Sequence, residues 1–557
     1  MKRIEHRFLQ LAIVLLILLL AFSCSKSDSQ KITADDLVSY EKITGLEFTV
    51  SERDSLLSDL EYAKGEYKNI RKTKIENSVS PRLNFDPRPR DFKINNEQKT
   101  ICWNLPATVE LPKNKAELAF MPVYKLASLI KERKITSVEL TQIYIERLKK
   151  YGDTLECVIT LTEDLAMAQA KRADEEMAMG KYRGYLHGIP YGLKDLFSVP
   201  GYKTTWGSVP YKDQILNDYA TVYQKLEQAG AVLVAKLTMG ALAMGDVWYN
   251  GETKNPWDLS QGSSGSSAGS ASATAAGLVA FAIGTETWGS IVSPATRCGV
   301  TGLRPTFGRV SRNGAMALSW TMDKVGPICR SAYDCALVFD VIRGKDSLDN
   351  TTVDYPFNYS EKTDIVKLRV GYLKDLFEGE DYPGKSTDLQ TIEVLKMLGV
   401  DFKALNLPEN LPVNSCAIIL EAEAGAAFDE LTRSNADDKM IQQHKNAWPN
   451  IFRKSRFIPA VEYIQASRIR DLLIEELNAL MKNYDVIVCP SFGGDQLLMT
   501  NLTGHPCVVV PNGFDNDNHP TSISFIGNLY DEATLLAFAK AYQNATEFDN
   551  QVPPMFK

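Results

Sequence analysis

Serine, threonine and glycine are concentrated between Gly262 and Gly314, where charged residues are few. Such a composition is typical of a flexible linker, because small side chains bury little surface. Here the run continues directly into an apolar block, ATAAGLVAFAIG, which must be buried, so a linker is excluded. Small residues let backbones approach closely, and hydroxyls beside converging N–H groups are typical of an oxyanion hole. The stretch therefore predicts an oxyanion hole next to serine hydroxyls.

Lys194 also lies at a position where a side chain could take part in catalysis. The segment before it, residues 188–193, carries no charge and is expected to form a short apolar strand. A lysine at the end of such a strand would be partly desolvated, which lowers its pKa and makes the neutral amine available as a general base. The simpler alternative is a surface lysine that pairs with Asp195.

These two regions together resemble a known family. The run SGSSAGS with AAGLVAFAIGTETWGSIVSPA after it, and the segment HGIPYGLKDLFSVPGYKTTWGS, are similar to the signature of the amidase signature family of Ser–Ser–Lys amide hydrolases. A gap-free alignment places the family's paired serines at Ser266 and Ser267, and its nucleophile at Ser290. The earlier pair, Ser263 and Ser264, would require a three-residue insertion. The resemblance covers about residues 119–550.

The resemblance implies a role for each residue. A neutral Lys194 would accept a proton from Ser266, which is held on a cis peptide bond and relays the proton of the nucleophile Ser290. Ser267 would form hydrogen bonds within the site. The oxyanion hole would be lined by the backbone amides of the loop that ends at the nucleophile, namely Thr287, Trp288, Gly289 and Ser290.

The implied reaction is hydrolysis of the C–N bond of a small-molecule carboxamide through an acyl-enzyme intermediate, without metal or organic cofactor. Two positions depart from the commonest pattern of the family. Trp288 replaces the first of two glycines before the nucleophile, and Val292 stands where many members carry arginine. A bulky Trp288 could narrow the acyl side, and the loss of the arginine removes an anchor for a carboxylate. The substrate therefore does not follow from the resemblance.

Three alternatives compete with this hypothesis. Gly265 to Gly269 matches G-x-S-x-G, the nucleophile elbow of Ser–His–Asp esterases and other hydrolases, with Ser267 as the nucleophile. That elbow needs a preceding strand, which the segment WDLSQGSS does not predict, and a histidine, for which His505 is the best placed of His444, His505 and His519. A catalytically inactive amidase fold that serves as a binding protein is the second alternative. The third is one component of an amidotransferase that works on charged tRNA.

The amino-acid composition of the chain restricts the kinds of partner that it can bind. The chain has 557 residues, 44% of them apolar and 24% charged, which is typical of a globular protein with a sizeable core. Its formal net charge of −7 and the absence of a basic stripe argue against nucleic acid as a partner. The nine cysteines form no CxxC pair, so a cysteine metal site is not expected.

The first residues predict export. Residues 1–23 combine a basic start with an apolar core too short for an ordinary membrane span, and the chain turns polar after Cys24. Cysteine after a small residue, Ser23, resembles a bacterial lipoprotein processing site, although Phe22 departs from it. We expect a lipid anchor on Cys24 that holds the protein in the cell envelope, in the periplasm or at the outer membrane. A soluble secreted form and an uncleaved anchor are the alternatives.

The remaining chain divides into an extension, residues 24–118, and a main domain, residues 119–557. In the extension, Thr33 with Asp36, and Ser51 with Asp54, predict the starts of two helices. A proline-rich strap follows, residues 77–113. The main domain alternates apolar strands with amphipathic helices, and residues 415–478 form a helical insert that is either a substrate mouth or a solvated cover. This pattern, with the resemblance, predicts an α/β/α sandwich around a large mixed sheet. Predicted strands are 188–193, 231–237, 368–373, 485–491 and 505–514, and predicted helices include 136–151, 162–180, 217–230, 336–344, 389–399 and 531–546.

Overall fold

The computed structural model describes residues 31–72 and 85–557. The chain separates into two compact units, Met1–Glu66 and Tyr67–Lys557. The predicted signal segment and Cys24 lie outside the described residues, as do residues 77–84 of the predicted strap. Every helix in the described ranges is too short or too polar to span a lipid bilayer.

The extension contains the two predicted helices, α2 (Ala34–Thr44) and α3 (Val50–Lys72). Thr33 and Asp36 form the expected capping box, each side chain accepting the other residue's backbone N–H. The cap predicted at Ser51 is wrong, because α3 begins earlier. Thr49 and Glu52 exchange these hydrogen bonds instead. The two pairs have the same spacing, so the sequence alone did not distinguish them.

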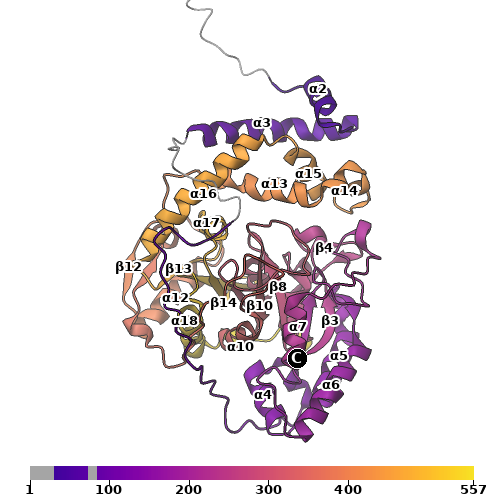
Figure 1. Cartoon of the computed structure of the whole chain (residues 1–557). Helices are drawn as coiled ribbons and strands as arrows, with labels where there is room; N and C mark the ends of the chain where they lie inside the picture. Colours follow the sequence, from indigo (N-terminus) through magenta and orange to yellow (C-terminus); the bar gives the residue numbers. More distant parts are fainter. Residues whose placement is uncertain (1–30, 73–84) are drawn as a thin grey trace, which may run out of the picture. The chain divides into compact units, whose positions relative to one another are not determined.

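A mixed sheet of eleven strands forms the centre of the second unit (Figure 1). Neighbours β2·β3, β2·β8, β11·β12 and β11·β13 are parallel, and the other pairs are antiparallel. In spatial order the strands are β1 (Val158–Leu161), β3 (Val232–Leu237), β2 (Pro190–Lys194), β8 (Phe281–Glu286), β10 (Lys324–Cys329), β9 (Thr301–Arg304), β14 (Cys507–Phe514), β15 (Pro520–Gly527), β13 (Val486–Pro490), β11 (Val370–Tyr372) and β12 (Phe402–Ala404).

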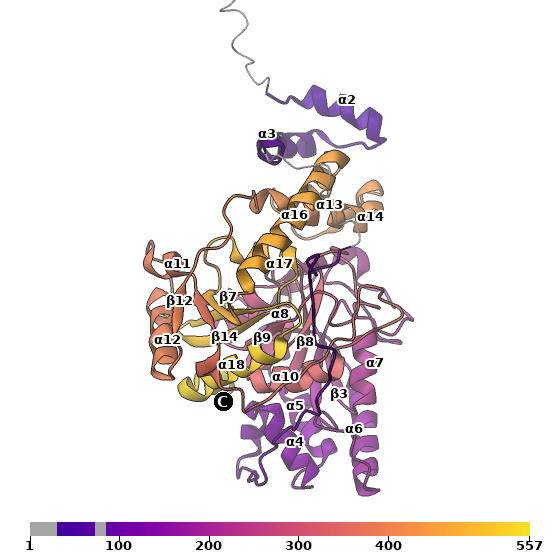
Figure 2. The same cartoon turned by 60° about the vertical axis from the view of Figure 1, so that its left-hand side comes forward.

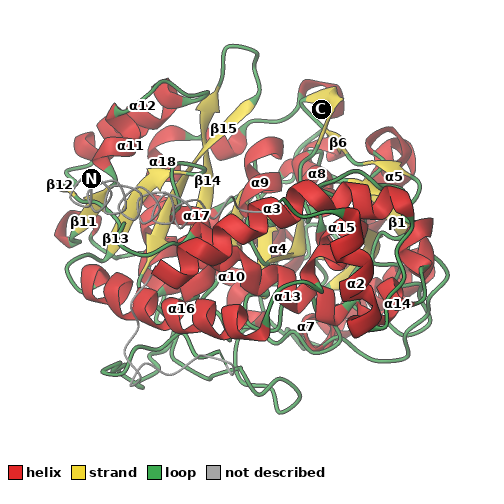
Figure 3. Ribbon diagram, turned by 90° about the horizontal axis from the view of Figure 1, so that it is seen from above, coloured by secondary structure: helices red, strands yellow, loops and turns green. Residues whose placement is uncertain are grey.

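Helices cover both faces of this sheet, which confirms the predicted α/β/α arrangement. On β14, Val508 and Val510 join the core that contains α10 and α18, whereas Cys507 and Val509 pack with α8 and α9, as alternation along a strand requires. Figure 3 shows β13, β14 and β15 beside one another with α12 and α18 close by. The helices of these layers are α4 (Val123–Lys131), α5 (Ser137–Leu155), α6 (Glu163–Ala178), α7 (Thr221–Gln228), α8 (Ala268–Ala275), α9 (Val292–Cys298), α10 (Ala332–Ile342), α11 (Lys374–Glu378), α12 (Lys385–Met397), α17 (Gln496–Thr503) and α18 (Glu532–Thr546).

The predicted insert is helical and gathers at one end of the second unit, coloured orange in Figures 1 and 2. Its aromatic residues belong to the main hydrophobic core of the second unit, and Trp448 stacks there on Phe452 and Phe452 on Phe428. The insert is therefore packed rather than a loose cover. Its α-helices are α13 (Ile418–Ala427), α14 (Asp429–Arg433), α15 (Trp448–Ser455) and α16 (Ala460–Met481).

The described part of the strap, residues 85–113, contains neither helix nor strand, as predicted. Two short hairpins that were not predicted lie before the serine-rich run: β4 (Val247–Trp248) with β5 (Gly251–Glu252), and β6 (Lys254–Asn255) with β7 (Asp258–Gly262). The expectation that no strand precedes the serines is therefore wrong. All eight cysteines in the described part of the chain are free thiols, and seven of them are buried.

Candidate active site

Lys194 ends strand β2, which is buried along its whole length between β3 and β8. Its amine donates hydrogen bonds to three hydroxyls, those of Ser266 at 2.8 Å, Thr285 at 2.9 Å and Ser267 at 3.1 Å. The side chain is fully buried. Burial lowers the pKa of Lys194 from 10.5 to about 7, and only the more distant carboxylates of Asp323 and Glu286 act in the other direction.

The neighbouring Asp195 does not pair with Lys194. Its carboxylate lies 2.9 Å from the amine of Lys236, a fully buried residue of β3. It also accepts hydrogen bonds from the backbone and hydroxyl of Thr205. The alternative of an exposed Lys194–Asp195 pair is therefore wrong.

Ser266 and Ser267 lie in the loop between β7 and α8. The Gly265–Ser266 peptide bond is cis, as the resemblance implies. A Cβ atom on Gly265 would lie 1.7 Å from the carbonyl oxygen of Gly245, so only glycine fits there. Ser267 donates to the Thr285 carbonyl and accepts from the Thr285 amide, which fixes its hydroxyl beside Lys194.

The earlier serine pair faces a different set of groups. The hydroxyl of Ser264 is hydrogen-bonded to that of Ser293 at 2.7 Å, and Ser263 donates to the carbonyl of Ser264. Lys194 donates to Ser266 and Ser267 rather than to either of these. The gap-free alignment thus agrees with the positions of the side chains.

Ser290 lies in the turn that joins β8 to α9 and is 9% exposed. Its carbonyl accepts the amide of Ser267 at 3.2 Å, which ties this turn to the paired serines. Among the described residues, no acceptor is hydrogen-bonded to the backbone amides of residues 287–290, and the Ser290 hydroxyl has no hydrogen-bond partner. Gly289 adopts a φ of +85°, a conformation in which glycine is favoured. The turn thus presents unoccupied donors beside a reachable hydroxyl.

Glu286 holds the far side of this turn. Its fully buried carboxylate accepts the amides of Ile291 and Val292 at 2.8 and 2.9 Å, and it pairs with Arg304 at 2.8 Å. Asn501 donates to the same carboxylate. Burial alone would raise the pKa of Glu286, but Arg304 and these hydrogen bonds outweigh it and lower the pKa to about 2.

Asp323 connects the turn to the loop that precedes β10. Its carboxylate accepts the hydroxyl of Thr287 at 2.6 Å and the amides of Leu318 and Ser319 at 2.8 and 3.0 Å. Burial raises the pKa of Asp323. Sequence reasoning missed Thr285, Glu286 and Asp323, because no motif marks them and their contacts depend on how β8 and β10 pair.

The part of the chain that the structure describes supplies no histidine for the alternative nucleophile elbow. His505 is fully buried, its ring is hydrogen-bonded to Thr503, and burial lowers its pKa to about 3. His519 contacts Asp258 and Gln261, and His444 is exposed. Strand β7 does precede Ser267 and α8 follows it, but in the described residues no histidine is hydrogen-bonded to Ser267.

Comparisons with known proteins agree with this geometry. A family model described as Amidase matches residues 139–536. Proteins named as one of the subunits of glutamyl-tRNA(Gln) amidotransferase are similar in sequence: that of Methylococcus capsulatus is 34% identical over 476 residues, covering 77% of this chain and 98% of the relative, and that of Marinomonas sp. is 35% identical over 479 residues, covering 78% and 98%.

Solved structures are also similar. The peptide amidase from Stenotrophomonas maltophilia superposes with a TM-score of 0.70 at 28% identity, covering 79% of this chain and all of that one. An amidase family protein from Bacillus anthracis superposes with a TM-score of 0.70 at 26% identity, covering 79% and 94%.

Proposed function

This chain belongs to the amidase family, the amidase signature enzymes, and we propose that it hydrolyses a carboxamide by a Ser–Ser–Lys relay with Ser290 as the nucleophile. The membership supports an enzyme that cleaves amide C–N bonds. The single observation that carries the relay is the buried hydrogen bond of 2.8 Å between the Lys194 amine and the Ser266 hydroxyl.

Proton transfer begins at Lys194. With a pKa of about 7, a substantial fraction of its amine is neutral at neutral pH and can accept the Ser266 proton. Ser266 in turn takes the proton of Ser290 as the Ser290 oxygen bonds to the amide carbon. The electron pair of the C=O bond moves to oxygen, and the backbone amides of residues 287–290 stabilise that negative charge.

Collapse of this intermediate breaks the C–N bond. The proton returns through Ser266 to the departing nitrogen, which leaves as a neutral amine or ammonia, and an ester remains on Ser290. Water then attacks the ester carbon, and the same relay accepts its proton. As the bond to Ser290 breaks, the relay returns this proton to the Ser290 oxygen and the carboxylic acid is released.

A fluorophosphonate probe tests the nucleophile directly. Intact-mass measurement of the labelled protein should show one adduct, which Ser290→Ala abolishes and Lys194→Ala slows. His505→Ala should leave it unchanged. Labelling at Ser267 that depends on His505 would contradict the relay and favour the esterase mechanism. No labelling together with no turnover of any amide would favour an inactive binding protein.

The names of the curated relatives make glutamine an amide to include among the substrates. Those proteins are components of an amidotransferase, whereas the net charge of −7 and the export-type start of this chain favour an amidase that works without tRNA. Ammonia release from glutamine by the chain alone, with and without added tRNA, separates the two reactions. A rate that requires tRNA would overturn the proposal of an independent amidase.

We also propose that the protein is exported and carries a lipid on Cys24. The basic start, the short apolar core and the cysteine after Ser23 support this. In a bacterial host, labelled fatty acid should be incorporated into the full chain and not into Cys24→Ala. A Cys24→Ala protein that is still labelled would contradict the lipid anchor.

A further inference from the structure

A pocket of about 160 Å³ opens beside the residues assigned to the relay. Thr285, which accepts from Lys194, and Thr287, the first residue of the turn that carries Ser290, form part of its wall. Thr287 lies three residues before Ser290, so a substrate whose amide carbon lies at Ser290 could extend into this pocket. Most of the remaining wall is apolar, with Leu196, Ala243, Met316, Ala317, Leu318 and Val325.

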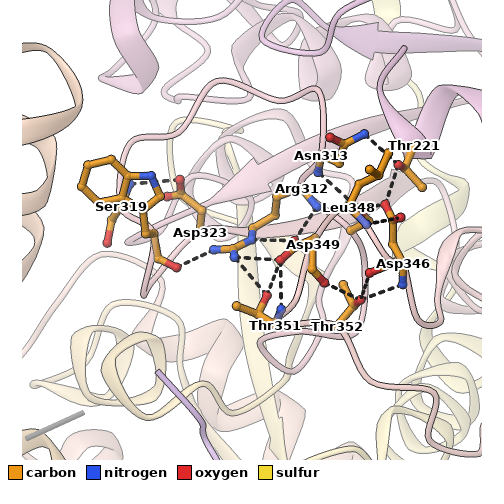
Figure 4. A network of polar contacts seen from close by, with 12 residues as sticks. Thr221, Arg312, Asn313, Ser319, Asp323, Asp346, Leu348, Asp349, Thr351 and Thr352 are labelled. Atoms are coloured by element: carbon orange, nitrogen blue, oxygen red, sulfur yellow. Dashed lines mark hydrogen bonds and ion pairs between the residues drawn. The ribbon is translucent and has the colours of Figure 1, made fainter. Parts of the chain in front are cut away.

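The charged residues in the wall are already bound to other parts of the protein. Arg312 donates to the carboxylate of Asp349, to Thr351 and to the carbonyl of Trp320, and Figure 4 shows the Arg312 and Asp349 side chains facing one another. Asp323 is occupied by one hydroxyl and two amides, as described above. These pairings leave Arg312, Asp323 and Asp349 engaged, so the pocket favours a neutral group.

Lys324 is the fourth charged residue in the wall. Its side chain is buried, and its amine donates to the carbonyls of Met322 and Asn501. Burial lowers the pKa of Lys324 well below the ordinary lysine value, and the two carbonyls hold its amine within the protein. Lys324 therefore adds no free cation to the pocket.

Two helices of the insert hold the loop of residues 319–321 at the mouth of the pocket. Glu423 of α13 accepts hydrogen bonds from the hydroxyls of Ser319 and Thr321, and Arg470 of α16 donates to Thr321 as well. The Trp320 side chain between them is 49% exposed. The insert thus fixes an apolar lip at the entrance and acts as part of the substrate mouth.

We infer that the substrate carries one apolar group of about the size of a benzene ring, which enters this pocket while the amide carbon lies at Ser290. An apolar protein cavity of about 150 Å³ accommodates benzene, so the volume of the pocket matches one ring or a branched alkyl group of that size. A group of two fused rings exceeds it. This inference rests on the proposed function and specifies its substrate class.

Two matched series of amides test the inference on the full chain. One series varies the acyl side (R–CO–NH₂) and the other the amine side (CH₃–CO–NH–R), with R as methyl, benzyl and naphthylmethyl. In one series kcat/KM should rise at least about tenfold from methyl to benzyl, and should fall at least about tenfold from benzyl to naphthylmethyl. That series identifies the side of the amide that enters the pocket.

Two variants change the pocket in opposite directions. Ala317→Leu fills it and should lower the benzyl-to-methyl ratio of kcat/KM at least about fivefold, whereas Met316→Ala enlarges it and should raise the naphthylmethyl-to-benzyl ratio. Leu407→Phe is the control, because it fills a separate hollow of about 340 Å³ beside α11 and α17 and should change neither ratio.

Ratios that do not change with the size of R, in an enzyme that the fluorophosphonate labels at Ser290, would overturn this inference and leave the proposed function intact. Absence of Ser290 labelling in the unsubstituted protein, together with no turnover of any amide, would overturn the proposed function and this inference with it.

Discussion

The carboxylate of Asp195 lies 2.9 Å from the amine of Lys236, and both side chains are fully buried. This ion pair neutralises the aspartate that follows Lys194 in the chain. Among the described residues, Lys194 therefore contacts only hydroxyl groups through its amine, and burial lowers its pKa to about 7. Because Asp195 binds Lys236 instead, it does not counteract the effect of burial on the pKa of Lys194.

The activity should depend on pH through Lys194. The neutral amine is the reactive form, so kcat/KM should rise with pH through about 7 and level off above it. Lys194→Ala should lose about 10²- to 10⁴-fold in kcat, the range typical of a general base. Lys194→Arg, which stays charged, should not restore the rate. A profile that is flat from pH 5 to 9 would contradict this role.

Asp323 should influence that profile without being the base. Its carboxylate raises the pKa of Lys194 against the stronger effect of burial. Asp323→Asn removes the charge and should shift the midpoint of the kcat/KM profile to lower pH. A variant that loses activity while the midpoint stays constant would reduce Asp323 to a purely structural role.

Ser290 and Ser267 should differ in their importance for activity. Ser290→Ala should lower kcat at least about 10⁴-fold, because the other hydroxyl of residues 287–290, that of Thr287, is bound to Asp323 and cannot replace the nucleophile. Ser267→Ala leaves the buried Thr285 amide without its hydroxyl partner and should destabilise the protein by about 1–3 kcal/mol. Ser267→Ala should still be labelled by the fluorophosphonate. Unfolding in urea and labelling together distinguish the two effects.

Glu286 should stabilise the fold and the turn at Ser290. Glu286→Gln leaves the buried Arg304 without its ion pair, which typically destabilises a protein by about 3–5 kcal/mol. The folded-state pKa of about 2 lies below the ordinary value of 4.5, so the stabilisation is complete above pH 4.5 and is lost as the pH falls toward 2. Urea unfolding between pH 2 and 6 measures this slope, and an equal slope in Glu286→Gln would contradict its origin in Glu286.

Sequence patterns predicted the local secondary structure better than they predicted which strands pair with one another. The capping box at Thr33 and the apolar strand before Lys194 depend on residues a few positions apart. Strand β15 begins at Pro520 and carries serine and threonine, and β10 contains a lysine, a glycine and a proline, so neither has the ordinary pattern of a strand. The pairing of β10 with β8, in which Lys324 lies opposite Glu286, is what brings the neighbouring Asp323 to the site. Only the resemblance to the amidase signature family indicated that Ser266 and Ser290 act together in one relay.

The free cysteines determine which conditions the chain needs in order to fold. Folding of the second unit requires no disulfide formation, because the eight described cysteines are free thiols and seven of them are buried. Folding in a reducing cytosol and folding after export should therefore give the same thiol count. An alkylating reagent applied to the native protein should modify Cys102 first, and the remaining described thiols only once the chain unfolds.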